Sequence, residues 1–270
     1  MRMETYNSVV KSINSIRKDP QEFLKEISVK NSCSYNSVLA IYTQCVQKKL
    51  NRTSYLHNDP QTQCDHWKQY KSQQSTDVEV IYNLAIHLDM PPVMLCKMFI
   101  ELSKPDKSLT SAHILRNLEC IEDPIFRSHI SYCLEHDDNF GPNIDLIKKS
   151  IGEEYESILK DKLMLMEIPY KDEDVMRNQG YDKTPDFLLT VPVAFGDHVI
   201  NWIESKASFG DEHNHKQYLR EQYWSYWNRF GPGLVIYWFG FIEELSEQTV
   251  GKGILVMDHL PGKFKTFQNM

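Results

Sequence analysis

Two acidic side chains and one lysine between residues 181 and 209 have the types and spacing that metal-assisted hydrolysis requires. The stretch reads YDKTPDFLLTVPVAFGDHVINWIESKASF and contains Asp186, Glu204 and Lys206. Carboxylate oxygens are ligands that Mg²⁺ prefers, together with waters and substrate phosphate. A neighbouring lysine could hold a metal-activated water as the ammonium, or deprotonate it as the neutral amine. These three residues are therefore candidates for hydrolytic chemistry at a phosphate.

A predicted β-hairpin must bring these residues together. Two strand-like runs, at about 184–195 and 199–207, are joined by Gly196-Asp197, a residue pair typical of tight hairpin turns. Apolar residues alternate along the first run, as on a strand with one buried face. Side chains at alternate positions of a strand share a face, so a lysine two residues after a glutamate projects beside it.

The register of this hairpin decides whether the third residue joins them. A three-residue loop centred on Gly196 would pair Asp186 with Lys206. The same register pairs Leu188 with Glu204 and places all three candidates on one face. A slip of one residue would send Asp186 to the opposite face.

The cluster has two interpretations. It is either a structural ion pair across an exposed hairpin or a cation site. Carboxylates about 4 Å apart repel by about 4 kcal/mol at an effective dielectric of roughly 20, and a bound divalent cation would reverse that sign. The spacing alone leaves both interpretations open.

The sequence motifs around the three residues resemble those of a known family. P-D followed by E-x-K on a hairpin resembles the motif of the PD-(D/E)xK nuclease superfamily, which has a restriction-endonuclease-like and Holliday-junction-resolvase-like fold. The words YDKTPDF, WIESKASFGDE and YWSYWNRFGPGLVIYWFGF resemble more specifically its TPD-motif family, to which the animal codanin-interacting nucleases belong. The resemblance is dense from about Asn139 to Leu245 and faint over the first 130 residues.

The resemblance implies a Mg²⁺-dependent nuclease, with Mn²⁺ as an alternative ion. It implies that Asp186 and Glu204 hold the metal with their carboxylates and that the main-chain carbonyl of Ser205 completes the protein ligands. Lys206 would orient the attacking water and offset charge on the phosphate. It also implies a nucleic-acid substrate, a codanin-type protein partner, and residence in the nucleus as well as the cytoplasm.

A predicted helix from about residue 144 to Pro169 adds a further candidate ligand. Resolvase-like members begin their core with a helix that carries a glycine and, four residues later, a glutamate at the metal; Gly152 and Glu156 match that spacing. Glu154 is the rival for the role, and an ordinary surface glutamate is the alternative. Because glycine costs about 1 kcal/mol in a helix relative to alanine, Gly152 is predicted to let the helix lie close to the sheet.

A second predicted helix, capped by Asp211 and ending near Arg229, has an aromatic face. We predict that this face belongs to the core, with base stacking as the alternative. Gln222 lies among the aromatic residues, needs a hydrogen-bond partner, and is predicted to support the metal ligands from behind. Lys216 and Arg220, one turn apart, are candidates for contact with a nucleic-acid backbone.

The elements together predict an α+β/α/β protein. Residues 1–138 form an all-helical domain, in which 78–102 has the pattern of a helix-turn-helix. An ordinary helical module is the alternative, because the second helix has Lys97 as its only base. Residues 139–270 form the nuclease-like domain, a mixed sheet flanked by helices.

Composition bounds the class of protein. The chain has 270 residues, 41% hydrophobic and 25% charged, as in soluble globular proteins, and its longest apolar run, 234–242, is too short to span a bilayer. The six cysteines lie in the first half without C-x-x-C spacing, which favours buried thiols in a reducing, intracellular compartment.

Charge is unevenly distributed along the chain. Residues 1–150 contain 18 basic and 18 acidic residues, whereas residues 151–270 contain 12 and 19. This balance argues against tight non-specific DNA binding. Branched DNA, single strands and RNA all remain open as substrates. The alternative function is a catalytically weak, nuclease-fold binding module that chiefly docks a protein partner.

Overall fold

The chain forms two compact units. The computed structural model describes residues 1–16, 20–104, 108–246 and 253–266. One unit comprises Met1–Tyr42 and Ser150–Met270, and the other comprises Thr43–Lys149. This division differs from the expected boundary after residue 138, because the first helices contact the segments that follow β3 and β4; the Met1 amine, for example, donates to the carbonyl of Phe241 at 2.8 Å. Within that unit Tyr6 stacks on Phe209, with ring centroids 5.8 Å apart.

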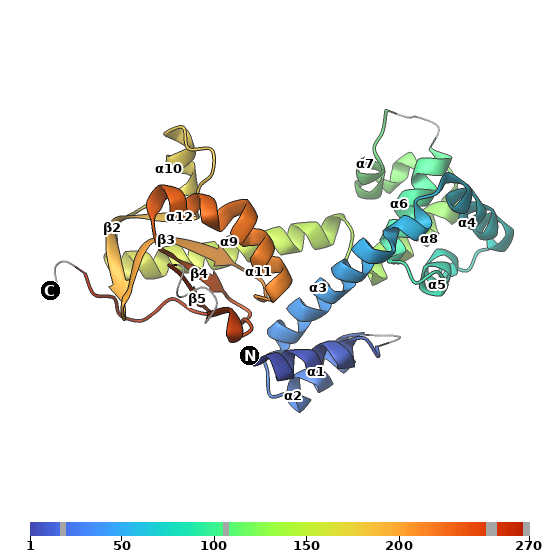
Figure 1. Cartoon of the computed structure of the whole chain (residues 1–270). Coiled ribbons are helices and arrows are strands. Elements are labelled where there is room, and N and C mark those ends of the chain that lie inside the picture. Colours follow the sequence, from blue (N-terminus) through green and yellow to red (C-terminus); the bar gives the residue numbers. More distant parts are fainter. Residues whose placement is uncertain (17–19, 105–107, 247–252, 267–270) are drawn as a thin grey trace. The chain divides into compact units, whose positions relative to one another are not determined.

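The unit with the sheet begins with helices and continues with alternating elements (Figure 1). Its helices are α1 (Met3–Ile13), α2 (Pro20–Lys30), the start of α3 (Tyr35–Thr53), most of α9 (Pro142–Leu165), α10 (Glu173–Asn178), α11 (Glu212–Tyr218), the π-helix η3 (Leu219–Tyr223) and α12 (Trp224–Phe230). Its strands are β1 (Tyr170–Asp172), β2 (Phe187–Phe195), β3 (His198–Lys206), β4 (Gly233–Tyr237) and β5 (Ile254–Met257).

The five strands form one mixed sheet in the order β1-β2-β3-β4-β5. The pairs β1–β2 and β2–β3 are antiparallel, and the pairs β3–β4 and β4–β5 are parallel. The predicted mixed sheet flanked by helices is therefore confirmed. A single antiparallel bridge between Ala194 and Lys265 adds to the edge of β2 outside the five named strands.

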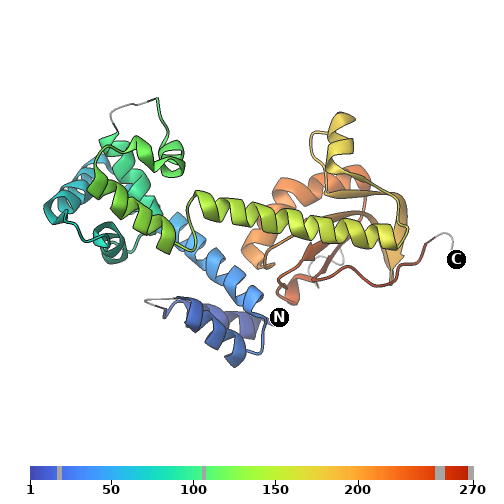
Figure 2. The same cartoon turned by 180° about the vertical axis from the view of Figure 1, so that it is seen from behind.

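Helices cover both faces of the sheet, because β3 and β4 send alternate side chains to opposite sides. On one face Ile203 packs with Leu159 and Leu163 of α9. On the other face Trp202 packs with Tyr223 and Tyr226 of the aromatic helix. Figure 1 shows α11 and α12 across one face, and Figure 2 shows α9 across the other. The sheet is thus a middle layer between helices, and the candidate residues lie where β2 begins and β3 ends.

The predicted hairpin register is wrong, by one residue beside the turn and by two residues at the end that carries Asp186. Leu188 pairs with Trp202 rather than with Glu204, and Phe195 pairs with His198, so the turn is a two-residue loop. The register shifts between Leu188 and Val193, which lie five residues apart on β2 but pair with positions two apart on β3. Pro192 lies in this irregular segment, where it has no N–H to donate to the neighbouring strand. Because the error at the Asp186 end is an even number of residues, the predicted facing of Asp186 survives.

The predicted close approach at Gly152 is wrong. A Cβ atom built on Gly152 would meet nothing within 4 Å. The buried residues of α9 are Leu159 and Leu163, which lie further along the helix. The helix therefore contacts the sheet through its second half, and the glycine has open space beside it.

The second unit is helical, as expected for that part of the chain. After the rest of α3 it contains η1 (Ser54–His57), α4 (Pro60–Gln73), α5 (Val80–His87), α6 (Pro92–Ser103), α7 (Ser111–Arg116), η2 (Leu118–Cys120), α8 (Pro124–His136) and the first residues of α9. Its core is built around the rings of Tyr70, Phe99 and Phe126. The α5–α6 pair is separated by a turn with Asp89 at φ 55°, and a role of this pair in DNA binding stays a prediction.

The six cysteines are free thiols. Cys96 and Cys133 are buried, whereas Cys64 and Cys120 are exposed, so the expectation of buried thiols is correct for only some of them. Across the described part of the chain, no helix is both long and apolar enough to cross a membrane.

Candidate functional site

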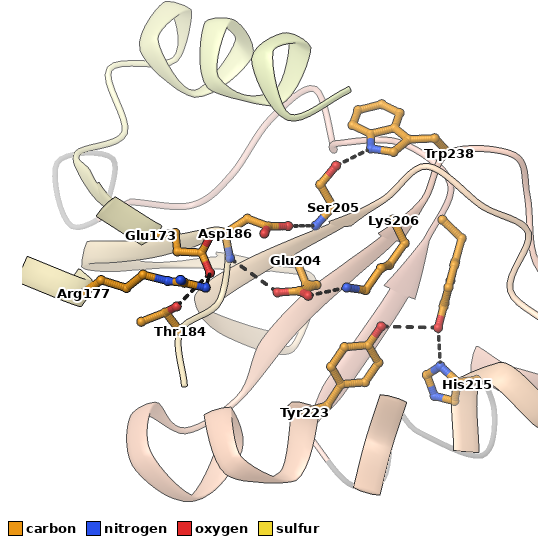
Figure 3. A network of polar contacts seen from close by, with 11 residues as sticks. Glu173, Arg177, Thr184, Asp186, Glu204, Ser205, Lys206, His215, Tyr223 and Trp238 are labelled. Atoms are coloured by element: carbon orange, nitrogen blue, oxygen red, sulfur yellow. Dashed lines mark hydrogen bonds and ion pairs between the residues drawn. The ribbon is translucent and has the colours of Figure 1, made fainter. Parts of the chain in front are cut away.

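The two candidate carboxylates are held together by hydrogen bonds across the hairpin (Figure 3). Asp186 directly precedes β2, and its Oδ2 accepts the backbone N–H of Ser205 at 2.7 Å. Glu204 lies near the end of β3, and its Oε2 accepts the backbone N–H of Asp186 at 3.3 Å. Each acidic side chain therefore binds the backbone of the opposite segment, so the ends of the two strands fix both carboxylates.

Lys206 lies beside this pair. Its Nζ is 2.5 Å from Oε1 of Glu204 and 5.0 Å from the ring centroid of Tyr218. Ser205, between them in sequence, points its hydroxyl the other way and accepts the indole N–H of Trp238 at 2.8 Å. The alternation of a β-strand thus brings the predicted carboxylates and the ammonium together on one side of the sheet.

Burial makes this charge cluster electrostatically expensive. Glu204 is 2% exposed, and its burial raises the pKa of the carboxyl, opposed by the Lys206 charge. Burial, followed by repulsion from Glu204, raises the pKa of Asp186 to about 8. Burial alone would lower the pKa of Lys206, but Glu204 and Asp186 raise it above its ordinary value. A single ammonium therefore leaves the two carboxylates only partly neutralised.

An acidic pocket adjoins Asp186. It is lined by Glu153, Glu156, Ser157, Lys160, Asp172, Glu173, Asp174, Asp186 and Phe187. Partial burial and then the charge of Asp186 raise the pKa of the Glu156 carboxyl to about 7. The structure thus brings Glu156 to the same pocket as Asp186, whereas the rival Glu154 does not line it.

Sequence reasoning missed the acidic residues that surround the start of α10. Asp172, Glu173 and Asp174 form the only D-E-D word of the chain. This run of three acidic residues can be detected in the sequence. No local pattern, however, predicts that β1 pairs with β2 and so brings these residues close to Asp186.

The three remaining predicted residues lie on the aromatic helix. Gln222 lies in the π-helix η3, a helix type often found at functional sites, and its Oε1 is buried without a hydrogen-bond partner among the described residues. Lys216 and Arg220 are exposed and do not line the acidic pocket, and Lys216 pairs with Glu212 at 3.3 Å. Their contact with nucleic acid stays a prediction.

The oxygen atoms of the site fit a hard divalent cation. Asp186 Oδ1 accepts no hydrogen bond within the described residues, and once Asp186 and Glu204 are both ionised they carry more negative charge than Lys206 offsets. In the same part of the chain, no group of three or more His, Cys, Asp or Glu side chains has the arrangement of a complete protein metal cage. Mg²⁺ does not require one, because it is usually bound by one or two carboxylates and several waters.

Comparisons with known proteins agree with the motif words. A family described as "Protein of unknown function TPD sequence-motif" matches residues 122–260. Proteins named "CDAN1-interacting nuclease 1" are similar over most of the chain. The Danio rerio protein is 42% identical over 234 residues, which are 84% of this chain and 78% of that protein. The Xenopus laevis protein is 40% identical over 266 residues, which are 95% of this chain and 87% of that protein.

The human protein of that name is 40% identical over 248 residues, which cover 88% of this chain and 85% of the human one. No solved structure matches the chain. The family match spans just over half of the residues, and the similarity to these relatives runs through both units. The chain therefore belongs to the TPD-motif family.

Proposed function

We propose that this chain is a metal-dependent nuclease of the PD-(D/E)xK type, which hydrolyses phosphodiester bonds with Mg²⁺ or Mn²⁺. The observation that carries the proposal is the meeting of Asp186, Glu204 and Lys206 at the ends of β2 and β3, beside a pocket of further carboxylates. The printed name of the relatives, which contains the word nuclease, supports the same reaction class.

The order of elements also supports the proposal. Helix α9, the antiparallel strands β1 to β3, the aromatic helix and the parallel strand β4 follow one another in the order expected of a resolvase-like core. Glu204 and Lys206 lie on β3, which pairs with β2 on one side and with β4 on the other.

The ligand roles follow from the donor set. Asp186 and Glu204 would hold the ion with their carboxylates, the main-chain carbonyl of Ser205 would add a third oxygen, and Glu156 would act through a water. A bound divalent ion would supply Lewis-acid activation of the phosphate and of a water. The backbone N–H of Ser205 keeps the Asp186 carboxylate oriented at 2.7 Å, so little reorganisation is needed on binding.

Lys206 acts on charge and orientation. Its ammonium is anchored by Glu204 and lies over the ring of Tyr218, so it is held near the carboxylates in a largely buried place. From there it orients the attacking water and offsets the negative charge that grows on the phosphate. Such electrostatic stabilisation is strong because the surroundings exclude much of the solvent.

We also propose that the chain works with a codanin-type protein partner, in the nucleus and the cytoplasm. Its relatives are named for an interaction with CDAN1. The excess of acidic residues in 151–270, 19 against 12 basic ones, favours help from a partner in bringing nucleic acid to the site. The substrate is a nucleic acid, with branched DNA, single strands and RNA to be compared.

The competing function is a binding module with little catalysis. One observation favours it: Lys206 occupies Oε1 of Glu204, so the site is internally compensated in part without a metal. The two functions differ in whether the carboxylates bind metal.

Calorimetric titration of Mg²⁺ and Mn²⁺ into wild type and Asp186→Asn, beside cleavage assays on branched DNA, single-stranded DNA and RNA, separates the two functions. Asp197→Asn is the matched control, because Asp197 lies exposed in the turn at the other end of the hairpin. The nuclease proposal expects metal binding and cleavage in wild type and the control and neither in Asp186→Asn. Equal metal affinity in all three proteins without cleavage leaves the binding module.

A further inference from the structure

The loop that leads into Asp186 is attached to three different elements. Arg229 of α12 pairs with Asp182 at 2.8 Å, and the ammonium of Lys183 donates to the carbonyl of Glu221 at 2.7 Å. The hydroxyl of Thr184 donates to Oε1 of Glu173, at the start of α10, at 3.2 Å. Only the third of these attachments reaches an element that also lines the acidic pocket.

Thr184 and its acceptor are well placed to act together. Thr184 is 7% exposed, so its hydroxyl needs an internal partner. Glu173 Oε1 accepts from Thr184 and also from Arg177 at 2.7 Å, so its charge is offset while it holds the loop. Figure 3 shows the three side chains converging beside Asp186.

Pro185, which lies between Thr184 and Asp186, links the anchored hydroxyl to the carboxylate through a restricted backbone. Pro185 is buried and has a fixed φ, and a residue that precedes proline is restricted to extended conformations. Fixing the side chain of Thr184 therefore leaves little freedom in the backbone before Asp186. In the order threonine, proline, aspartate, the anchored side chain of Thr184 and the fixed φ of Pro185 together restrict the backbone conformation that leads into Asp186.

We propose that Thr184 and Glu173 are positioning residues, whose hydrogen bond fixes the direction in which the Asp186 carboxylate enters the pocket. The role in catalysis rests on the proposed nuclease function, but the positioning itself does not. The structure offers a direct measure of it, because Asp186 Oδ2 accepts the backbone N–H of Ser205. If Asp186 loses its direction, that N–H loses its partner.

The test is amide hydrogen exchange of Ser205 in metal-free Thr184→Val, with Mg²⁺ titration and cleavage of nucleic acid measured beside it. Valine keeps the shape of threonine without its donor. We expect exchange at Ser205 to become about fivefold faster, in line with the loss of one hydrogen bond. Mg²⁺ affinity or kcat should fall by about tenfold or more, with KM little changed, as when a residue behind a metal ligand is removed.

Two further variants keep the proposal falsifiable. Thr184→Ser retains the hydroxyl and should restore wild-type exchange and affinity. Thr190→Val is the matched control, because Thr190 is exposed on β2, and it should change nothing. If Thr184→Val fails to fold, Glu173→Ala removes the acceptor instead and should speed exchange at Ser205 in the same way. A Glu173 that is only a metal ligand would lower affinity without changing that exchange, and so would contradict the proposal.

The outcomes separate the two claims. Wild-type exchange at Ser205 in both Thr184→Val and Glu173→Ala overturns the positioning role, whatever the enzyme does. Faster exchange in a protein whose wild type neither binds metal nor cleaves nucleic acid upholds the positioning role and ends the nuclease proposal.

Discussion

The ammonium of Lys206 lies 2.5 Å from the carboxylate of Glu204, two residues before it on the same strand. The other oxygen of Glu204 accepts the N–H of Asp186 at 3.3 Å. Both Glu204 oxygens are therefore engaged, and a metal that binds this carboxylate must share it with Lys206. This competition lets the roles of the two residues be separated by mutation.

Lys206→Met should abolish most cleavage and leave metal binding intact or slightly stronger. Methionine fills the space over Tyr218 but removes the positive charge that opposes a cation at Glu204. We expect kcat to fall by about a hundredfold or more, the size of effect that a group moving protons or offsetting charge has. Calorimetry with Mn²⁺ and a single-turnover cleavage assay measure the two effects.

Glu204→Gln should lose both properties. The substitution replaces one of the two anionic ligands with a neutral amide. Because Mg²⁺ gives up its bound waters reluctantly, the single carboxylate of Asp186 should not hold the ion. A Glu204→Gln protein with wild-type metal affinity would contradict the ligand assignment, even if cleavage were lost.

The stability of the metal-free protein should fall as pH rises from about 4 to about 8. The pKa of Asp186 is raised from 3.8 to about 8, so in this range the folded state retains a proton that the unfolded state has released. The folded state then binds more protons, and the free energy of unfolding decreases with rising pH. Glu204 and Glu156 act in the same direction.

The Asp186→Asn variant has no titrating carboxyl group at this position. Its melting temperature in EDTA should therefore decline less between pH 6 and pH 8 than that of wild type. Added Mg²⁺ should raise the melting temperature of wild type more at pH 8 than at pH 6, because the ionised carboxylate is the form that binds it. A variant and a wild type with parallel pH profiles would show that Asp186 is not the group responsible.

Two glycine-to-alanine substitutions should have opposite effects. A Cβ on Gly233 would lie 2.1 Å from the ring of Trp202, which is fully buried, so Gly233→Ala should lower the free energy of unfolding by about 1–3 kcal/mol or more. A Cβ on Gly152 would meet nothing within 4 Å, so Gly152→Ala should raise it by about 1 kcal/mol through helix propensity. Urea unfolding of the two variants measures both changes, and a destabilised Gly152→Ala would revive the close approach of α9.

The aromatic helix should show a graded response to truncation. Tyr226 is 4% exposed and packs edge to face on Trp202, so Tyr226→Ala should cost about 3–5 kcal/mol of stability, as large aromatic deletions from a core do. The aromatic face as a whole was predicted to belong to the core, but Trp227 on this helix is 38% exposed, so Trp227→Ala should cost clearly less. Thermal unfolding of both proteins decides the order, and equal losses would count against the observed facing of the helix.

Local sequence patterns specify the residue types of the site and the helices and strands that carry them. The alternation of β3 puts Glu204 and Lys206 on one face, and this follows from their spacing alone. The aromatic helix with Asp211 as its cap, the break at Asp89 and the helix that carries Glu156 are also local signals, and each is present in the structure.

The remaining features of the site depend on contacts between segments that are far apart in the chain. The hairpin register depends on the irregular segment around Pro192, and the role of Gly152 depends on what lies opposite it. Glu173 reaches the site because β1 pairs with β2, a contact that no local pattern specifies. Periodicity and turn chemistry act over a few residues, so a sequence displays them directly. Pairing and burial depend on residues far apart in the chain, and they become visible only once the sheet has formed.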